Sequence, residues 1–289
     1  MTWLIIGGSG QLGIALSEEL GQRGIAFKAW GRQELDITKE SFVRDLIGAL
    51  APKVIINCAA WTDVDGAEDN EDLAILVNSQ GVENLAKAAK ACGAKLVHIS
   101  TDYVFSGHSD EPWKETDLKQ PLSAYGRSKA SGEDKALVFY SHGTYIIRTA
   151  WLYSAWGKNF VKTIARKALE NGPVKVVNDQ YGQPTSATEL ANRIIELLLS
   201  SAKPGIYHVT NSGKASWFDF AQEIYRLLGK QDSLVEPVSS DVFVRPAPRP
   251  TNSTLSNESW SSAGLPPMSN WKSALREAMP SIILQIHEA

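Results

Sequence analysis

The chain begins with a short apolar run that leads at once into a glycine-rich turn. Trp3-Leu4-Ile5-Ile6 is followed by Gly7-Gly8-Ser9-Gly10-Gln11-Leu12-Gly13, and the apolar periodicity of residues 14–22 then indicates a helix. In this order of strand, turn and helix, glycines let backbone N–H groups approach a pyrophosphate at the positive end of the helix. The alternative is a loop that needs glycine only for its positive φ angles. With its flanking strand and helix, the turn predicts a dinucleotide-binding α/β fold.

Apolar runs that indicate strands alternate with amphipathic helical patterns along the first half of the chain. We expect strands at 25–30, 52–58, 95–99 and 144–148, and helices at 39–50, 71–91 and 123–137. Crossovers of this length require a parallel sheet with right-handed connections. We therefore predict a Rossmann-type doubly wound parallel sheet in residues 1–150 and a smaller, less regular C-terminal substrate-binding domain in 151–289. A helix expected near 187–199 can pack back on the first domain.

The end of the second expected strand bears on the choice between NAD and NADP. A carboxylate at this point hydrogen-bonds the adenosine ribose of NAD, whereas an arginine pairs with the 2′-phosphate of NADP. Arg32 stands there, so we predict NADPH, with NADH as the alternative and a solvated loop charge as the purely structural explanation. Asp36 and Ile37 are candidates for the adenine side, although Asp36 or Thr38 is equally suited to cap the following helix. The small residues Ala59 and Ala60, after the third strand, leave room for a cofactor near the backbone.

Two polar groups follow the fourth expected strand. Ser100-Thr101-Asp102 comes directly after the apolar run, at the strand end where open α/β sheets bind ligands. Tyr125 and Lys129 are four residues apart, which places the phenol and the ammonium one turn apart on one helical face. A nearby cation lowers the pKa of a phenol from about 10, so that it can protonate a carbonyl oxygen, and the Thr101 hydroxyl can bond the same oxygen. The alternative for the pair is an ordinary contact on a helix surface.

Composition and charge exclude several classes of function. The chain has 289 residues, a hydrophobic fraction of 43% and a formal net charge of -3 with both signs interspersed, so nothing favours nucleic acid or an anionic membrane as a partner. Cys58 and Cys92 lie in apolar surroundings, as expected of small core residues in a reduced protein. The apolar run from Trp3 to Ile6 is far too short to span a membrane, and no basic region precedes it. We expect a soluble, cytoplasmic protein.

Several motifs, in their order and spacing, carry a resemblance to a known family. They are Gly7-x-x-Gly10-x-x-Gly13, Asn57-x-Ala59-Ala60, the run 100–105, Tyr125-x-x-x-Lys129, Arg148-Thr149-x-Trp151, the run 178–185 and Arg249-Pro250-x-Asn252-Ser253. The chain resembles the extended short-chain dehydrogenase/reductases over essentially its full length, and among them the dTDP-4-dehydrorhamnose reductase family. The resemblance implies an oxidoreductase of dTDP-rhamnose biosynthesis. Such an enzyme uses NADPH or NADH to reduce the C4 ketone of a nucleotide sugar, dTDP-4-dehydro-L-rhamnose, to dTDP-L-rhamnose.

The resemblance implies a role for each matching residue. Tyr125 is expected to donate the proton, Lys129 to lower its pKa and hold the nicotinamide ribose, and Thr101 to bind the sugar carbonyl. The remaining expected cofactor contacts are Gly7, Gly10, Gln11, Leu12 and Gly13 at the pyrophosphate, and Ala59, Ala60 and Trp61 along the middle of the cofactor. The remaining expected substrate contacts are Asp102, Trp151, which is equally suited to simple packing, and Arg249 at the nucleotide diphosphate.

Two positions depart from the pattern of the family. Trp61 stands where many relatives have tyrosine or histidine, so the shape of the pocket can differ. Some relatives form a metal-bridged dimer through a glutamate early in the first helix, where this chain has Ala15, although Glu189 matches another such ligand. A single carboxylate does not make a site, so we predict no bound metal and leave a homodimer open. The alternatives to the predicted enzyme are a reductase of another nucleotide-linked 4-ketohexose and a non-catalytic, NADP-binding regulatory subunit.

Overall fold

A six-stranded parallel sheet forms the centre of the computed structural model, which describes residues 2–288. The strand order is β10-β5-β4-β3-β1-β2, and every neighbouring pair runs parallel. The strands are β1 (Trp3–Ile6), β2 (Phe27–Trp30), β3 (Val54–Asn57), β4 (Lys95–Thr101), β5 (Thr144–Thr149) and β10 (Gly205–His208). The predicted doubly wound parallel sheet is therefore confirmed. Its order reverses between β1 and β3, where such sheets leave a crevice for ligands.

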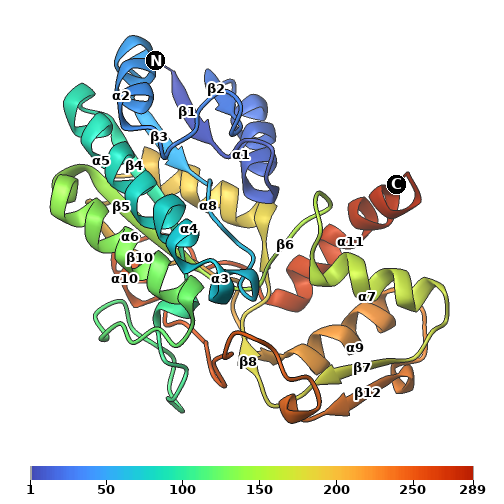
Figure 1. The fold of residues 1–289 in the computed structure, drawn as a ribbon. Helices are drawn as coiled ribbons and strands as arrows, with labels where there is room; N and C mark the ends of the chain where they lie inside the picture. Colours follow the sequence, from blue (N-terminus) through green and yellow to red (C-terminus); the bar gives the residue numbers. More distant parts are fainter. Residues whose placement is uncertain (1, 289) are drawn as a thin grey trace.

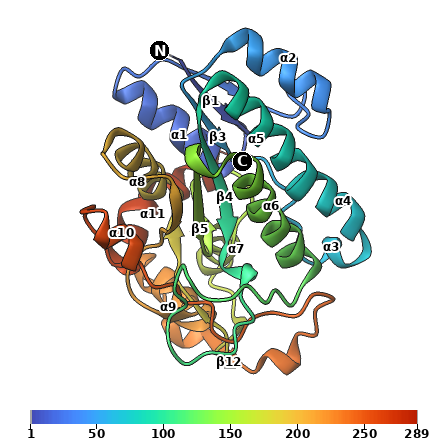
Figure 2. The same cartoon turned by 90° about the vertical axis from the view of Figure 1, so that its left-hand side faces the viewer.

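Helices cover both faces of this sheet (Figure 1 and Figure 2). One face carries α1 (Gln11–Gln22) and α8 (Ala187–Leu199), and the other carries α2 (Glu40–Leu50), α5 (Gly81–Cys92) and α6 (Ala124–Tyr140). Successive strand residues point to opposite faces, so Ile5 and Val97 pack with α1 and α8, whereas Leu4 and Leu96 pack with α2 and α5. Because both faces are covered, the central strands β1 and β3 are buried along their full length and are almost continuously apolar. Within residues 2–288, none of the helices combines the length and the apolar character needed to cross a bilayer.

A smaller body of helices and short strands adjoins the sheet, at the lower right of Figure 1. In it α7 (Phe160–Leu169), α9 (Trp217–Leu227) and α11 (Trp271–His287) pack around one apolar core. This core includes Val161 of α7 and Phe220 and Ile224 of α9. Three ladders of two strands each join β7 (Val174–Val177) with β12 (Val235–Val238), β8 (Tyr181–Gly182) with β11 (Ala215–Ser216), and β6 (Leu152–Tyr153) with β9 (Thr185–Ser186). Neither α11 nor the short α10 (Glu258–Ser262) was expected from the sequence.

The chain returns to the sheet after its first passage through the smaller body. Helix α8 packs against α1, and β10 pairs with β5 as the last strand at that edge. The segment 187–208 thus lies with the sheet although it follows residue 150. The division of the chain into domains at residue 150 stays a prediction.

The helix expected over 71–91 is confirmed as one helical run from residue 71 to residue 92, which contains a π-helical turn. The structure has α3 (Gly66–Asp69), α4 (Glu71–Ile75), a π-helical turn at Leu76–Gln80 and then α5. Asn78, in the π-helical turn, accepts a hydrogen bond from the backbone N–H of Trp61 at 2.8 Å and donates one to the Ser128 hydroxyl at 2.9 Å. These contacts tie the turn to the loop after β3 and to α6. A π-turn often marks a functional position in a helix, and this one lies against the helix that carries Tyr125 and Lys129.

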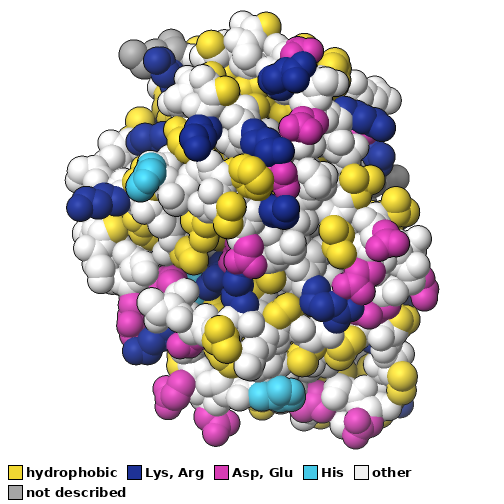
Figure 3. All heavy atoms as spheres, turned by 60° about the vertical axis from the view of Figure 1, so that its left-hand side comes forward, with side chains coloured by type: hydrophobic (Ala, Val, Ile, Leu, Met, Phe, Trp, Pro, Cys, Tyr) yellow, Lys and Arg dark blue, Asp and Glu magenta, His cyan; other side chains and the backbone are white. Residues whose placement is uncertain are grey.

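Acidic and basic side chains are interspersed over the face shown in Figure 3, in keeping with the mixed charge pattern of the sequence. Lys87 on α5 and Lys135 on α6 both pair with Glu83, at 2.7 and 2.8 Å. Glu83 is buried, but both lysine side chains are partly exposed, and ion pairs at the surface contribute about 0–1 kcal/mol each. The apolar packing of the two helices on the sheet therefore contributes more to their position than these charges do.

The close contact between α6 and the π-helical turn generates a first prediction. A Cβ atom on Gly132 would overlap the backbone oxygen of Asn78. Replacing an exposed helical glycine by alanine usually stabilises a protein, but Gly132→Ala is expected to lower the free energy of unfolding by about 1–3 kcal/mol because of this overlap. The measurement is urea unfolding of both proteins.

Gly48→Ala is the matched control, because Gly48 lies in α2 with nothing within 4 Å of its added Cβ. This variant is expected to gain up to about 1 kcal/mol. Equal effects at the two positions would contradict the close packing described here.

Candidate active site

A cleft of about 830 Å³ opens at the carboxyl ends of the central strands. Its size is that of a pocket for a small molecule or cofactor. All the residues predicted for the site except Arg249 line it: Gly7, Gly10, Gln11, Leu12, Gly13, Arg32, Asp36, Ile37, Ala59, Ala60, Trp61, Thr101, Asp102, Tyr125, Lys129 and Trp151. The structure therefore brings the separate motifs together in one place, which spacing along the chain alone does not establish.

The glycine turn between β1 and α1 leaves no room for side chains. Gly7 has a φ of +77°, and a Cβ added to it would lie 2.7 Å from the backbone nitrogen of Ala59. A Cβ on Gly13 would overlap the carbonyl oxygen of Gly7. Gly10 is the N-cap of α1 and no side chain bonds there, so the first N–H groups of this helix remain available for an anion. This cradle fits the pyrophosphate of a dinucleotide cofactor.

Arg32 and Asp36 flank the same end of the cleft. Arg32 is exposed just beyond β2, where it can meet a ligand phosphate without displacing other contacts. Asp36 accepts hydrogen bonds from the N–H and the hydroxyl of Thr38, at 3.0 and 2.7 Å. Burial acts to raise the pKa of Asp36, but these bonds outweigh it and hold the pKa below its usual value. The proposed capping of α2 by Asp36 is wrong, because Lys39 is the N-cap and has no side-chain bond.

Tyr125 and Lys129 lie on the first turns of α6, which begins where the Ser123 hydroxyl accepts the N–H of Gly126 at 3.1 Å. Burial raises the pKa of Tyr125 to about 12, although a hydrogen bond with Thr101 acts in the opposite direction. Lys129 is only 2% exposed, and its Nζ donates to the carbonyl oxygen of Ile99 at 2.6 Å. Burial lowers the pKa of Lys129 to about 8.

Burial is the largest influence on the pKa of Tyr125 in this structure, and the lowering of that pKa by Lys129 stays a prediction. The ammonium of Lys129 bonds to the strand carbonyl at Ile99. Tyr125 therefore keeps its proton near neutral pH. The hydrogen bond with the Thr101 hydroxyl acts in the opposite direction and favours ionisation of Tyr125.

Asp102 is a buried carboxyl at the start of the 3-10 turn that follows β4. It is 3% exposed, and one carboxyl oxygen accepts from the Thr101 hydroxyl at 2.9 Å. The other oxygen has no hydrogen bond of ordinary geometry among residues 2–288, although the Ser253 hydroxyl lies near enough to act on the pKa of Asp102. Burial raises the pKa of Asp102 to about 6, although neighbouring hydrogen bonds act against this shift. An orphaned acceptor at this depth is suited to bind a hydroxyl of a ligand in the cleft.

Trp151 forms an aromatic wall with a second tryptophan that the sequence patterns did not single out. The rings of Trp151 and Trp217 are stacked with centroids 3.5 Å apart and an angle of 8° between planes, and both side chains line the cleft. Trp151 has a φ of +45°, an unfavourable backbone conformation for a bulky residue. Strain of this kind is typical of functional sites. Trp217 is the first residue of α9. Only its stacking with Trp151, which is far from it in the sequence, indicates a role in the cleft.

Arg249 lies behind the cleft rather than in its lining. Its Nη2 donates to Asp65 at 2.9 Å, and its guanidinium lies 6.0 Å from the centre of the Tyr103 ring. Tyr103 in turn meets the Tyr125 ring edge to face, with centroids 5.8 Å apart. Nη1 of Arg249 has no partner among the described residues. Contact between Arg249 and a diphosphate therefore stays a prediction, which requires Arg249 to turn from Asp65.

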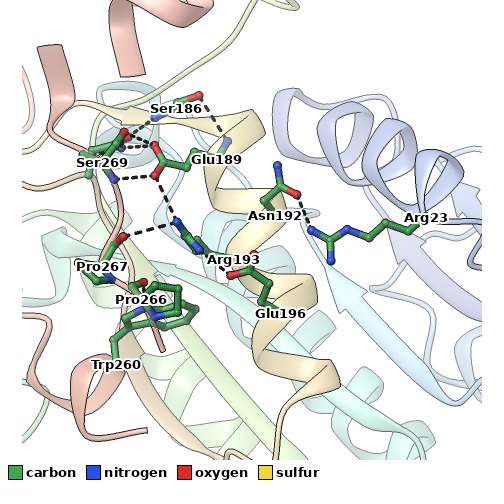
Figure 4. A network of polar contacts seen from close by, with 11 residues as sticks. Arg23, Ser186, Glu189, Asn192, Arg193, Glu196, Trp260, Pro266, Pro267 and Ser269 are labelled. Carbon is green, nitrogen blue, oxygen red and sulfur yellow. Dashed lines mark hydrogen bonds and ion pairs between the residues drawn. The ribbon is translucent and has the colours of Figure 1, made fainter. Parts of the chain in front are cut away.

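Glu189 is held by internal hydrogen bonds (Figure 4). Its carboxylate accepts from the N–H and the hydroxyl of Ser269, at 2.6 and 2.7 Å, and from the Asn211 amide. Figure 4 also shows Arg193 next to Glu189, with Nη2 3.9 Å from the carboxylate. In residues 2–288, no three His, Cys, Asp or Glu side chains are grouped as metal ligands would be.

The raised pKa of Asp102 generates a prediction about stability and pH. A carboxyl whose pKa is higher in the folded chain than its ordinary 3.8 binds more protons when folded, so its effect on stability becomes unfavourable as the pH rises through about 4 to 6. From the pKa of about 6, this group costs wild type about 2 kcal/mol between pH 4.5 and pH 7. Asp102→Asn is expected to remove this cost, so that its stability relative to wild type improves by about that amount over the same interval.

Denaturant unfolding of both proteins at the two pH values measures this difference. The neutral variant also changes a hydrogen bond, but that effect is the same at both pH values. A stability difference between the proteins that does not vary with pH would show that Asp102 has an ordinary pKa.

Comparison with known proteins agrees with this geometry. A family model described as the RmlD substrate binding domain matches residues 1–283. A dTDP-4-dehydrorhamnose reductase of Streptomyces griseus is 44% identical over 284 residues, which cover 97% of this chain and 93% of that protein. A dTDP-4-keto-6-deoxy-D-glucose reductase of Streptomyces niveus is 40% identical over 281 residues, 96% of each chain.

The similarity extends to solved structures. A dTDP-4-dehydrorhamnose reductase of Bacillus anthracis, solved in complex with NADP, matches with a TM-score of 0.93 at 38% identity, covering 96% of this chain and 98% of that one. Sequence and structure thus agree over both the sheet and the smaller body. The chain belongs to the dTDP-4-dehydrorhamnose reductases, a family of oxidoreductases among the extended short-chain dehydrogenase/reductases.

Proposed function

We propose that this chain reduces the C4 ketone of dTDP-4-dehydro-L-rhamnose to dTDP-L-rhamnose, with NADPH as hydride donor. The observation that carries the proposal is the meeting of Thr101, Tyr125 and Lys129 with the glycine turn in one cleft, in a chain of this family. NADPH supplies the hydride when bound, and the chain supplies binding, orientation and a proton. The NADP complex of the Bacillus anthracis relative supports the choice of cofactor.

The two ends of the cofactor meet different parts of the cleft. The N–H groups at the start of α1 bind the pyrophosphate, because Gly7 and Gly13 keep side chains out of its way. Arg32 pairs with the 2′-phosphate, while Asp36 and Ile37 contact the adenine side. Lys129 holds the nicotinamide ribose, and Ala59, Ala60 and Trp61 line the path between the two ends.

Tyr125 and Thr101 act on the oxygen of the ketone. As the hydride reaches the carbon, negative charge develops on this oxygen, and two hydroxyl donors in a buried site stabilise that charge strongly. Tyr125 then transfers its proton to the oxygen, which completes the alcohol. Burial raises the pKa of Tyr125 to about 12. A free alkoxide is a stronger base than a phenolate with this pKa, so transfer of the proton from Tyr125 to the alkoxide is favourable. Asp102, through its unpartnered oxygen, and Trp151 orient the sugar ring.

A second substrate is favoured by one specific observation. The Streptomyces niveus relative, named for dTDP-4-keto-6-deoxy-D-glucose, matches this chain at 40% identity, close to the 44% of the Streptomyces griseus relative. The two ketosugars differ in ring stereochemistry, which is recognised by the shape of the pocket around the sugar. Trp151 and Trp217 shape that part of the cleft.

The test of function follows NADPH oxidation by absorbance with each ketosugar generated by its upstream enzymes. The proposal expects the larger kcat/KM with dTDP-4-dehydro-L-rhamnose and a product identified as dTDP-L-rhamnose. Faster turnover of dTDP-4-keto-6-deoxy-D-glucose would transfer the proposal to the second substrate. Tight NADPH binding with no turnover of either sugar would refute both.

Tyr125→Phe tests the proton donor. The variant removes one hydroxyl and is expected to lower kcat by about 10²- to 10⁴-fold, the usual contribution of a general acid, with little change in NADPH binding. Tyr207→Phe is the control, because its hydroxyl donates to Lys203 outside the cleft, and it should retain activity. Near wild-type turnover by Tyr125→Phe would exclude Tyr125 as the acid.

Arg32→Glu tests the reading of the 2′-phosphate. Loss of a hydrogen bond to a charged group, about 1.5–3 kcal/mol, is expected to weaken NADPH binding by tenfold or more while NADH is affected little. Lys39→Glu makes the same change of charge nearby at an exposed position outside the cleft lining. Titration of intrinsic fluorescence with both cofactors gives the ratio. An equal change in the ratio of NADPH to NADH affinity in the two variants would mean that the overall positive charge of this region, and not Arg32 itself, binds the 2′-phosphate.

A further inference from the structure

His98 lies in β4, one residue before Ile99, and nothing in the proposed mechanism uses it. Its side chain is fully buried, and its two ring nitrogens face different partners. Nδ1 lies 3.1 Å from the amide nitrogen of Asn57, and Nε2 lies 3.4 Å from Nζ of Lys129. A buried polar ring is costly unless its nitrogens are bonded. The position of the single ring proton therefore decides how His98 acts on Lys129.

The orientation of the Asn57 amide decides where that proton lies. The backbone N–H of Ala59 points at Oδ1 of Asn57 at 3.1 Å. Because an N–H can only donate, the atom facing it is the amide oxygen, and the NH₂ group then faces His98. The reverse orientation would set two donors against each other. Nδ1 of His98 therefore accepts, and the proton of the neutral ring is on Nε2.

His98 is neutral near pH 7. Burial lowers its pKa well below the ordinary 6.5, and the charge of Lys129 lowers it further. Its Nε2–H thus points at Lys129, whose ammonium form has three donors and no acceptor. The neutral amine has a lone pair, so it can accept from Nε2–H while it donates to the Ile99 carbonyl at 2.6 Å. His98 opposes the charged form of Lys129 and bonds the neutral one.

We propose that His98 is a positioning residue that weakens the proton affinity of Lys129 by donating Nε2–H to its neutral amine. The role in turnover rests on the proposed function, whereas the hydrogen bond is a property of the chain itself. In turnover, a donor at Nε2 of His98 makes Lys129 lose its proton at a lower pH than a hydrogen-bond acceptor at the same place would.

The other titratable groups around Lys129 are Glu133, Cys58 and Tyr125. Glu133, one turn further along α6, favours the charged form, but its carboxylate is bound by Arg148 at 2.9 and 2.7 Å. Burial raises the pKa of the Cys58 thiol and of the Tyr125 phenol to about 12, so both are neutral at pH 7. Burial is the main reason that the pKa of Lys129 falls to about 8. With the proton of His98 on Nε2, the direction of Nε2–H acts in the same sense.

The first test reads the tautomer of His98 in the wild-type, cofactor-free protein from the ¹⁵N shifts of its ring. His208 is an internal reference, because it is also fully buried and its Nδ1 lies 2.9 Å from the carbonyl oxygen of Ser256. A carbonyl can only accept, so His208 carries its proton on Nδ1. We expect opposite tautomers for the two histidines. A proton on Nδ1 of His98, or a charged ring at pH 7, overturns the proposal.

The second test follows the ¹³Cε shift of Lys129 with pH, the signal being assigned by its loss in Lys129→Arg. In His98→Gln, an amide oxygen can face the ammonium, so the midpoint is expected to rise by about one pH unit or more, a tenfold gain in proton affinity. His142→Gln makes the same change at an exposed position, in the 3-10 turn Ser141–Gly143 before β5, and should leave the midpoint in place. An unchanged midpoint in folded His98→Gln overturns the proposal. If that variant does not fold, the tautomer measured in the wild-type protein decides between the outcomes.

Turnover separates this proposal from the proposed function. If the protein reduces a ketosugar, the high-pH limb of kcat/KM should move upward in His98→Gln by the same interval as the NMR midpoint. A midpoint that moves without the limb refutes the role of His98 in turnover. Absence of turnover in wild type refutes the proposed function, while the two NMR tests still decide whether His98 bonds the neutral amine.

Discussion

The close approach of three backbone segments around the first turn is the constraint on which the rest of the site depends. A Cβ on Gly7 would lie 2.7 Å from the nitrogen of Ala59, and one on Gly13 would overlap the oxygen of Gly7. These contacts bring the ends of β1 and β3 to the N-terminus of α1, so backbone N–H groups rather than side chains face the cleft. Arg32, Thr101 and Trp151 reach the same cleft because their strands are parallel and end at the same edge.

Burial determines the proton chemistry of this cleft. It raises the pKa of Tyr125 to about 12 and that of Asp102 to about 6, and it lowers the pKa of Lys129 to about 8. Each shift favours the neutral form, as expected when charged groups leave water. The same exclusion of water strengthens the hydrogen bonds that Tyr125 and Thr101 offer to a developing negative charge. A buried carboxyl and a tryptophan at positive φ lower stability, a common cost of a functional site.

Most residues of the predicted site line one cleft, because their motifs lie at strand ends and the parallel sheet brings these ends together. What the sequence did not reveal are the hydrogen-bond partners that several of these side chains have in the structure. Asp36 was expected as a possible helix cap from its place in the chain. In the structure, its carboxylate instead accepts hydrogen bonds from the N–H and the hydroxyl of Thr38. Lys129 stood one turn from Tyr125, but the strand carbonyl at Ile99 holds its ammonium. Arg249 was expected at the diphosphate, and Asp65, which no motif includes, binds it outside the cleft lining.

The sequence by itself determined the parallel sheet, the glycine turn and the Tyr-x-x-x-Lys pair, because each is written in local spacing: apolar runs of strand length, glycines at fixed intervals and two side chains one helical turn apart. Only the tertiary structure decided the direction in which pKa values shift, the pairing of Trp151 with Trp217 and the tautomer of His98. Burial, stacking and the orientation of a buried amide arise between segments far apart in the chain. Periodicity cannot report such contacts, because the same local pattern is compatible with many neighbours.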